Sequence, residues 1–178
     1  MGLRSTMRHL LEIDDLIPDE LVAVVERCEA APETLGKPYA GSGVACVFEK
    51  PSARTRNSTE IAVVQLGGHP VYIVDAEVGI DKRETAEDVA RTLACYHRTI
   101  CARVFRHSVL ERMAALDVAP VVNLLSDEGH PLQAIADVLP IRAELGSVKD
   151  KVVTYVGDAN NVTRSLALAV GYLGGTTR

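Results

Sequence analysis

Short apolar runs alternate with segments of helical periodicity along most of the chain. The runs are rich in valine and isoleucine and are bounded by glycine, proline or polar residues, which is typical of buried strands. They predict strands at residues 44–48, 70–74, 99–105, 121–125 and 152–156. Elsewhere apolar residues recur every three or four positions, which predicts helices at residues 18–30, 52–66, 85–96, 109–116, 130–145 and 162–173.

This alternation determines the predicted fold class, which is α/β. Parallel strands joined by right-handed crossovers form an open sheet with helices on both faces, a three-layer α/β/α arrangement. We assign residues 1–146 to this domain and residues 147–178 to the first strand and helix of a truncated second α/β domain. The apolar strand at 152–156 then has unpaired edges, so we expect the isolated chain to be aggregation-prone or to need partner chains.

The composition is that of a folded globular protein. Of 178 residues, 47% are hydrophobic and 24% are charged. The net charge of −5 argues against a nucleic-acid surface, because there is no basic excess to neutralise phosphates. No signal peptide or long apolar span is found, so we expect a cytoplasmic location and no membrane contact. The cysteines, including the buried-strand residues Cys46 and Cys101, show no metal-ligand spacing, and no metal site is expected.

The segment P-S-A-R-T-R, residues 51–56, lies between a predicted strand and a predicted helix. The first N–H groups of a helix lack backbone acceptors and lie at the positive end of the helix dipole, so they favour an anion. Arg54 and Arg56 add fixed positive charge, and Ser52 and Thr55 add hydroxyl groups. The segment is neither a Walker loop nor a dinucleotide fingerprint. It predicts a phosphate-binding turn, although a solvated helix N-cap with surface charge fits the same residues.

Two further groups of polar residues follow predicted strands. Arg103 lies near the end of the strand at 99–105, and His130 and Gln133 open the helix after the strand at 121–125. In open parallel sheets ligands bind outside the carboxyl ends of the strands. Together these side chains would form an oxyanion-type site beside a phosphate. Taken singly, Arg103 fits a surface charge and His130 fits a structural helix start. Asn161 and its neighbours after the fifth strand fit a helix N-cap better than a substrate contact.

Four segments together resemble the aspartate/ornithine carbamoyltransferase family. F-E-K-P-S-A-R-T-R resembles the carbamoyl-phosphate signature, whose usual form is S-T-R-T-R, and D-E-G-H-P-L-Q-A-I-A-D is similar to the H-P-x-Q signature. A-R-V-F matches the strand that supplies a further arginine. V-G-D-A-N-N-V-T-R-S-L resembles the ornithine branch more than the aspartate branch. The four segments occur in the family's order over nearly the whole chain.

The resemblance implies an activity and a set of site residues. The reaction is carbamoyl transfer from carbamoyl phosphate to the δ-amino group of L-ornithine, giving L-citrulline and phosphate, as in arginine biosynthesis. The residues implied for carbamoyl phosphate are Ser52, Ala53, Arg54, Thr55, Arg103, His130 and Gln133. Arg103, His130 and Gln133 are the implied catalytic residues, and Asn161 is the implied contact to ornithine. The family uses no metal, organic cofactor or covalent intermediate, and its complete members are homotrimers with shared sites.

The sequence also departs from the family pattern. Ala53 replaces the usual threonine, which we expect to weaken phosphate binding modestly. Gly79 stands where the ornithine branch often has glutamine, and Lys82 could reach a neighbouring subunit instead. The family's S-M-G and H-C-L-P segments, which belong to the amino-acid domain, do not occur. The acceptor therefore stays open between ornithine and another amine, such as putrescine, a modified ornithine or aspartate. A non-catalytic module that binds phosphate or carbamoyl phosphate is the further alternative.

Overall fold

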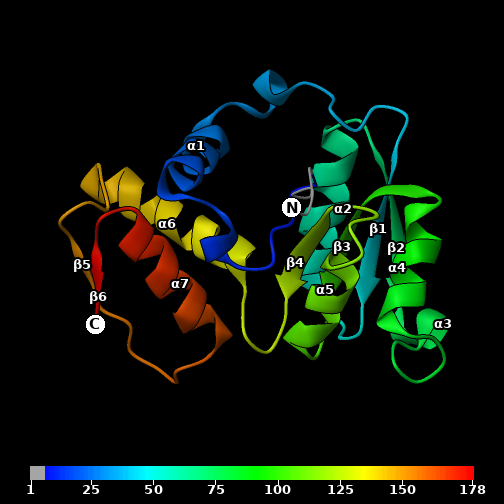
Figure 1. Cartoon of the computed structure of the whole chain (residues 1–178). Helices are drawn as coiled ribbons and strands as arrows, with labels where there is room; N and C mark the ends of the chain where they lie inside the picture. The colour runs from blue at the N-terminus through cyan, green and yellow to red at the C-terminus, as the bar shows by residue number, and fades with distance from the viewer. Residues whose placement is uncertain (1–6) are drawn as a thin grey trace, which may run out of the picture.

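A parallel sheet forms the centre of the molecule (Figure 1). The computed structural model describes residues 7–178, and within them the main sheet has four strands in the order β2-β1-β3-β4. The strands are β1 (Gly43–Phe48), β2 (His69–Val74), β3 (His97–Arg103) and β4 (Val121–Leu125). All their pairings are parallel, as predicted. Leu10 adds a single parallel bridge to Val122, so the start of the chain lies along the β4 edge.

Helices cover both faces of this sheet. Strand side chains alternate between the faces, so Val47 packs under α4 (Ala86–Ala94) and α5 (His107–Ala114), while Cys46 packs on the opposite side with α2 (Ala53–Gln65). The start of α6 (Pro131–Leu145) lies on the α2 side, where Leu132 joins the same apolar cluster. The predicted three-layer α/β/α arrangement is confirmed.

Cys46 and Cys101 are buried and free, and burial raises their thiol pKa values to about 11 and about 12.

A second apolar core lies beside the sheet, where α1 (Pro18–Glu29), α6 and α7 (Asn161–Tyr172) pack together (Figure 1). Its fully buried members include Ile13, Leu21, Val138 and Val170. The short helices η1 (Ile13–Asp15) and η2 (Pro32–Leu35) flank α1, and β5 (Val152–Val153) pairs with β6 (Thr176–Thr177) next to α7. Residues 147–178 thus pack on α6, and a domain division at residue 146 stays a prediction.

No helix among residues 7–178 has the length and apolar character needed to cross a bilayer.

The structure corrects the predicted elements in three places. A four-residue helix, α3 (Asp75–Val78), runs into residues 77–83, a polar segment with one glycine that predicts a loop, and the Glu77 carboxylate caps its start by accepting the Val74 N–H at 2.8 Å. A helix this short has no apolar periodicity for the sequence to display. The strand predicted at 152–156 is only two residues long, and Val156 is 93% exposed. Its partner β6 was not predicted, because two threonines give no apolar signal.

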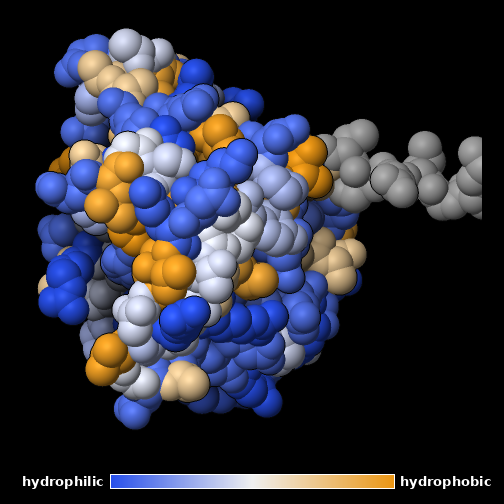
Figure 2. Space-filling model, turned by 90° about the vertical axis from the view of Figure 1, so that its left-hand side faces the viewer, coloured by the Kyte–Doolittle hydropathy of each residue, from blue (hydrophilic) through white to orange (hydrophobic). Residues whose placement is uncertain are grey.

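The face at the β5–β6 end of the molecule carries several separate hydrophobic areas (Figure 2). Large apolar residues exposed in this part of the fold are Ile17 (61%), Leu145 (54%), Val152 (55%) and Val156 (93%). Exposed apolar side chains next to a short, open strand favour association between copies.

We therefore expect the purified 178-residue chain to self-associate at micromolar concentration, as measured by sedimentation velocity. The double substitution Val152→Lys and Val156→Lys should shift the distribution towards monomer. Val118→Lys, at another exposed valine (40%), should not. A stable wild-type monomer with one sharp unfolding transition would contradict this prediction.

Candidate functional site

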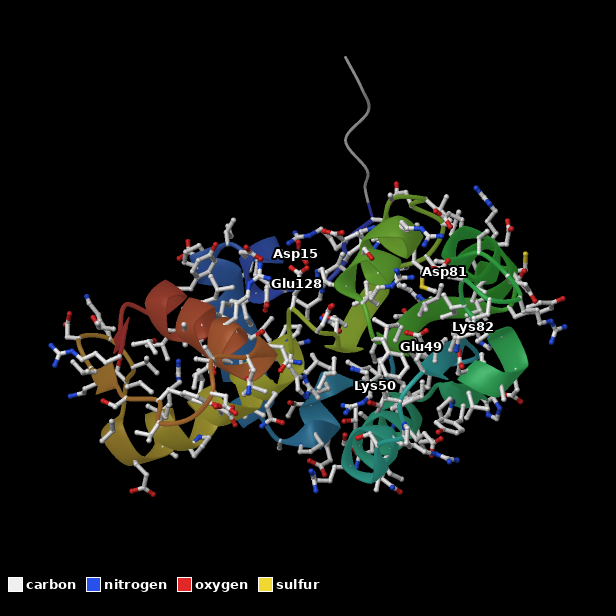
Figure 3. All side chains as sticks on the ribbon, turned by 90° about the horizontal axis from the view of Figure 1, so that it is seen from below. Asp15, Glu49, Lys50, Asp81, Lys82 and Glu128 are labelled. Carbon is white, nitrogen blue, oxygen red and sulfur yellow. The ribbon has the colours of Figure 1, made fainter. Side chains whose placement is uncertain are left out.

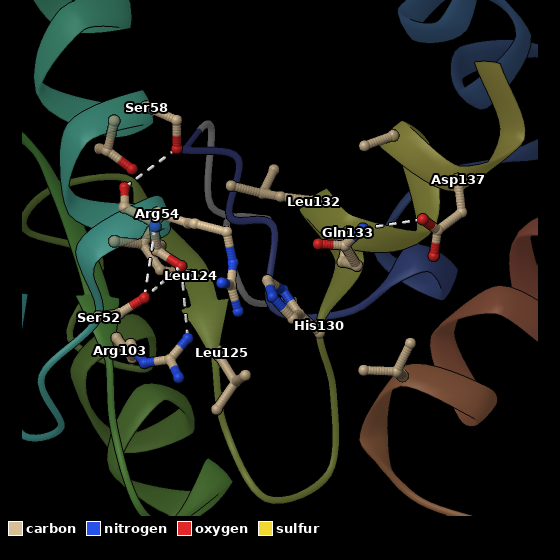
Figure 4. A pocket seen from close by; sticks show the side chains of 14 residues that line it. Ser52, Arg54, Ser58, Arg103, Leu124, Leu125, His130, Leu132, Gln133 and Asp137 are labelled. Carbon is tan, nitrogen blue, oxygen red and sulfur yellow. Dashed lines mark hydrogen bonds between the residues drawn. The ribbon is translucent and has the colours of Figure 1, made fainter. Parts of the chain in front are cut away.

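A pocket of about 560 Å³ opens at the carboxyl ends of β1, β3 and β4 (Figure 4). This is the edge of a parallel sheet at which ligands usually bind. Its walls come from the start of α2, the last residue of β3, the end of β4 and the first two turns of α6. The lining residues are Ser52, Arg54, Thr55, Ser58, Thr59, Arg103, Leu124, Leu125, His130, Leu132, Gln133, Ala136, Asp137 and Val162.

The start of α2 forms one wall of the pocket. Ser52 is the N-cap: its hydroxyl oxygen accepts the Thr55 N–H at 3.3 Å, and its hydroxyl donates to Thr55 Oγ1 at 3.0 Å. The N–H groups of Ala53 and Arg54 have no acceptor within the described residues. They are free to bind an anion. The side chain of Ala53 does not line the pocket.

Arg54 and Arg103 point into the same space, from α2 and from the end of β3 (Figure 4). Arg103 Nη1 donates to Thr55 Oγ1 at 3.4 Å, and its buried Nε has no hydrogen-bond partner in residues 7–178. Burial lowers the pKa of Arg103, and the positive charge of the nearby Arg54 lowers it further. Among residues 7–178 no carboxylate lies within salt-bridge distance of either guanidinium. Within the described residues neither guanidinium is ion-paired, and the one carboxylate of the pocket lining, Asp137, is hydrogen-bonded to Gln133 instead.

Arg56, the second arginine of the predicted turn, does not line the pocket. Its guanidinium stacks on the ring of Tyr72 at 3.6 Å, and its Nε binds Glu60 at 3.1 Å. The alternative of a surface role therefore holds for Arg56, whereas Ser52, Arg54 and Thr55 face the pocket as predicted.

His130 faces the two arginines from the start of α6 (Figure 4). Burial lowers the pKa of the His130 imidazole to about 4. The charge of Arg103 acts in the same direction, and the charge of Asp137 acts against it. The imidazole is therefore neutral at pH 7, with one N–H and one acceptor nitrogen. Its buried Nδ1 has no partner among the described residues.

Gln133 lies one turn further along α6. One N–H of its amide Nε2 donates to Asp137 Oδ1 at 2.8 Å, which leaves its second N–H and its carbonyl Oε1 for a ligand. Asp137 itself was missed in the sequence. The signal was available, because residues 130, 133 and 137 share one helix face at spacings of three and four.

The structure does not bring Asn161 into this pocket. Its side-chain amide donates to the carbonyl of Ser126, and its Oδ1 accepts the Val162 N–H at 2.9 Å. The neighbouring Asn160 is the N-cap of α7, which confirms the capping interpretation of this segment.

Lys82 lies outside the pocket, near Glu49, as the view from below in Figure 3 shows. Its ammonium group pairs with Asp75 of the same chain at 2.8 Å. The loop that carries it begins at Gly79, whose positive φ of 54° fits glycine. In this chain Lys82 thus has an internal partner.

Comparison with known proteins identifies the family. Residues 8–143 match the model described as aspartate/ornithine carbamoyltransferase, carbamoyl-P binding domain. The chain belongs to this family. Among similar carbamoyltransferases, the ornithine carbamoyltransferase of Thermus thermophilus is 44% identical over 161 residues, which are 89% of this chain and 54% of that protein. That of Hyperthermus butylicus is 44% identical over 175 residues, covering 94% of this chain and 56% of that protein.

The solved carbamoyltransferase structures agree with this assignment. The ornithine carbamoyltransferase of Pyrococcus furiosus superimposes with a TM-score of 0.88 at 38% identity, covering 98% of this chain and 58% of that one. The described fold is therefore that of the carbamoyltransferase family, with its parallel sheet and flanking helices. The chain spans about half the length of the curated relatives it matches.

Proposed function

We propose that this chain supplies the carbamoyl-phosphate half of an ornithine carbamoyltransferase, which transfers the carbamoyl group to the δ-amino group of L-ornithine. The observation that carries the proposal is the pair of guanidinium groups, Arg54 and Arg103, which share one pocket and which no carboxylate of the described residues pairs with. Two nearby cations in a partly buried site repel each other, and a dianion between them relieves the repulsion. Complete, the enzyme would be a cytoplasmic homotrimer of arginine biosynthesis.

The phosphate group would lie at the start of α2. The free N–H groups of Ala53 and Arg54 belong to the first turn of α2, and Ser52 and Thr55 of the same turn line this space. The guanidinium of Arg103 can bind two phosphate oxygens at once. Ala53 contributes its backbone alone, so a missing hydroxyl at this position leaves most of the donors in place.

The carbamoyl group would lie between Arg103 and the start of α6. When the neutral amine attacks the carbamoyl carbon, the carbonyl oxygen gains negative charge, and the Arg103 N–H groups and the single N–H of neutral His130 would stabilise it. Gln133 would accept a hydrogen bond from the carbamoyl NH₂ through Oε1, while one N–H of its own amide is held by Asp137. The bond between the carbamoyl carbon and the phosphate oxygen then breaks, and phosphate leaves bound by the same arginines, taking up the proton that the amine nitrogen loses. Losing one such donor typically costs about 3 kcal/mol of transition-state stabilisation.

The acceptor is assigned to ornithine because the segment at residues 156–166 resembles the ornithine branch and because the relatives named above are ornithine carbamoyltransferases. Asn161 would contact ornithine only after giving up its hydrogen bond to Ser126. That bond favours as a second candidate a module that binds carbamoyl phosphate without turnover.

We expect carbamoyl phosphate to raise the melting temperature of the 178-residue chain, because a ligand that binds only the folded state stabilises it. Scanning fluorimetry with carbamoyl phosphate and with inorganic phosphate measures this. Citrulline formation after adding ornithine would select the enzyme, and stabilisation without citrulline would select the binding module. Putrescine and aspartate serve as alternative acceptors. Absence of any thermal shift with carbamoyl phosphate would contradict both forms of the proposal.

A further inference from the structure

A buried carboxylate lies behind the pocket, where η1, α6 and α7 meet. Glu12 is only 4% exposed, and Ser165 of α7 is fully buried. The Ser165 hydroxyl donates to the two Glu12 carboxylate oxygens, at 2.7 and 2.8 Å, and Glu12 Oε1 also accepts the Ile13 N–H at 2.8 Å. The Ser165 oxygen in turn accepts the backbone N–H of His130 at 2.8 Å. A continuous chain of hydrogen bonds therefore runs from Glu12 through Ser165 to His130.

The same carboxylate packs against the turn that precedes His130. A Cβ added to Gly129 would lie 2.6 Å from Glu12 Oε2, so the turn and the carboxylate are in close contact. The turn is also held by Asn123, whose Nδ2 donates to the Gly129 carbonyl at 3.2 Å, and by Ser126, whose Oγ accepts the Gly129 N–H at 3.2 Å. Three side chains thus fix the turn.

An ionised carboxylate is an expensive group to bury, and burial raises the pKa of Glu12. An apolar residue would fill a structural position at lower cost. The polar contacts that Glu12 gains are the Ile13 N–H, which is local, and Ser165, whose remaining hydrogen bond goes to His130. The long-range effect of the carboxylate is therefore exerted on the residue that closes the carbamoyl end of the pocket.

We propose that Glu12 and Ser165 are positioning residues, which hold the backbone of His130 so that its imidazole is fixed against Arg103 at the carbamoyl end of the pocket. The choice of carbamoyl phosphate as the ligand rests on the proposed function, whereas the hydrogen bonds among Glu12, Ser165 and His130 do not. It assigns a role in the pocket to the start of the chain and to α7, neither of which supplies the predicted phosphate contacts.

The test uses Ser165→Ala and Glu12→Leu, which break the chain of hydrogen bonds, and Glu12→Gln, which keeps an acceptor for Ser165. Ser147→Ala is the matched control, because Ser147 also accepts a backbone N–H, from Lys149 at 3.0 Å, but is exposed and distant from the pocket lining. Two properties are measured on the full chain. One is the titration of the His130 ring by NMR without ligand, and the other is the dissociation constant of carbamoyl phosphate against that of inorganic phosphate.

In Ser165→Ala and Glu12→Leu we expect the His130 pKa to move from about 4 towards the ordinary range of histidine. Carbamoyl phosphate should bind about fivefold or more weakly, the usual effect of one lost hydrogen bond, while inorganic phosphate binds as before. The double variant Glu12→Leu/Ser165→Ala should bind carbamoyl phosphate no more weakly than Ser165→Ala alone, because both substitutions act through the same hydrogen bond to His130. Glu12→Gln and Ser147→Ala should behave as the wild type.

An unchanged His130 titration in Ser165→Ala, or equal weakening of both ligands, would overturn the proposal. If the wild-type chain binds no carbamoyl phosphate, the proposed function fails while the ring titration still decides the positioning role. Should both disruptive variants fail to fold, hydrogen exchange of the wild type decides instead: the His130 amide must exchange much more slowly than that of Glu128, and rapid exchange refutes the inference.

Discussion

Replacing Arg103 by methionine is expected to weaken the binding of carbamoyl phosphate about a hundredfold and to leave the chain at least as stable as the wild type. The loss follows from removing charged hydrogen bonds to phosphate and carbonyl oxygens, each worth about 1.5–3 kcal/mol. The gain in stability follows from the lowered pKa of Arg103, which means that burial and Arg54 disfavour its charge in the folded chain. Isothermal titration calorimetry and thermal melts measure the two effects on the same samples.

Two further substitutions separate charge from geometry. Arg103→Lys keeps the positive charge but cannot bind two oxygens in a plane, so it should recover only part of the affinity. Arg98→Met is the control on the same strand: Arg98 lies at the opposite end of β3, where it donates to the Pro38 carbonyl at 3.1 Å, and its loss should leave the affinity unchanged. Equal affinities of wild type and Arg103→Met would place the phosphate elsewhere.

The fold was predictable because its elements carry strong, regular signals. The strands β1 and β4 are nearly continuous apolar runs and β3 has an apolar centre, and such runs are typical of parallel strands buried on both faces. Parallel pairing then places the ends of these strands on one edge of the sheet, whatever the loops do. The convergence of Arg54, Arg103 and His130 on one pocket followed from this topology and needed no knowledge of side-chain positions.

Other features depend on contacts between distant segments and were out of reach. The direction of the Gln133 amide depends on Asp137, and the partner of Asn161 is a carbonyl 35 residues earlier in the chain. Glu12 lies 153 residues from Ser165, and nothing in the sequence distinguishes it from the other acidic residues before α1. Polar groups of this kind acquire their roles only when folding buries them, because burial obliges each of them to find a partner.

Lowering the pH from 7 to 4 is expected to cost the wild-type chain about 2 kcal/mol of unfolding free energy more than it costs the variant His130→Gln. The folded pKa of His130 is about 4, below the ordinary value of about 6.5 that applies to the unfolded chain. Between these values the unfolded chain binds more protons than the folded one, so stability rises with pH across this window. The contribution is complete above about pH 6.5 and is lost as the pH falls through 4. The full shift corresponds to about 3 kcal/mol, and solvent around the partly exposed ring reduces it.

The comparison with His130→Gln isolates this residue, because other groups titrate in the same range. Burial raises the pKa of Glu12, for example, and that shift changes stability with pH in the opposite direction. His69→Gln, at an exposed histidine on the far end of β2, should follow the wild type. Chemical denaturation at pH 7.0, 5.5 and 4.0 gives the free energies. A bound phosphate dianion favours the protonated ring, so saturating carbamoyl phosphate should reduce the difference between wild type and His130→Gln at acidic pH. Parallel pH curves for the two proteins would mean that His130 is not held neutral in the pocket, and the N–H donor assigned to it at the carbamoyl end would be lost.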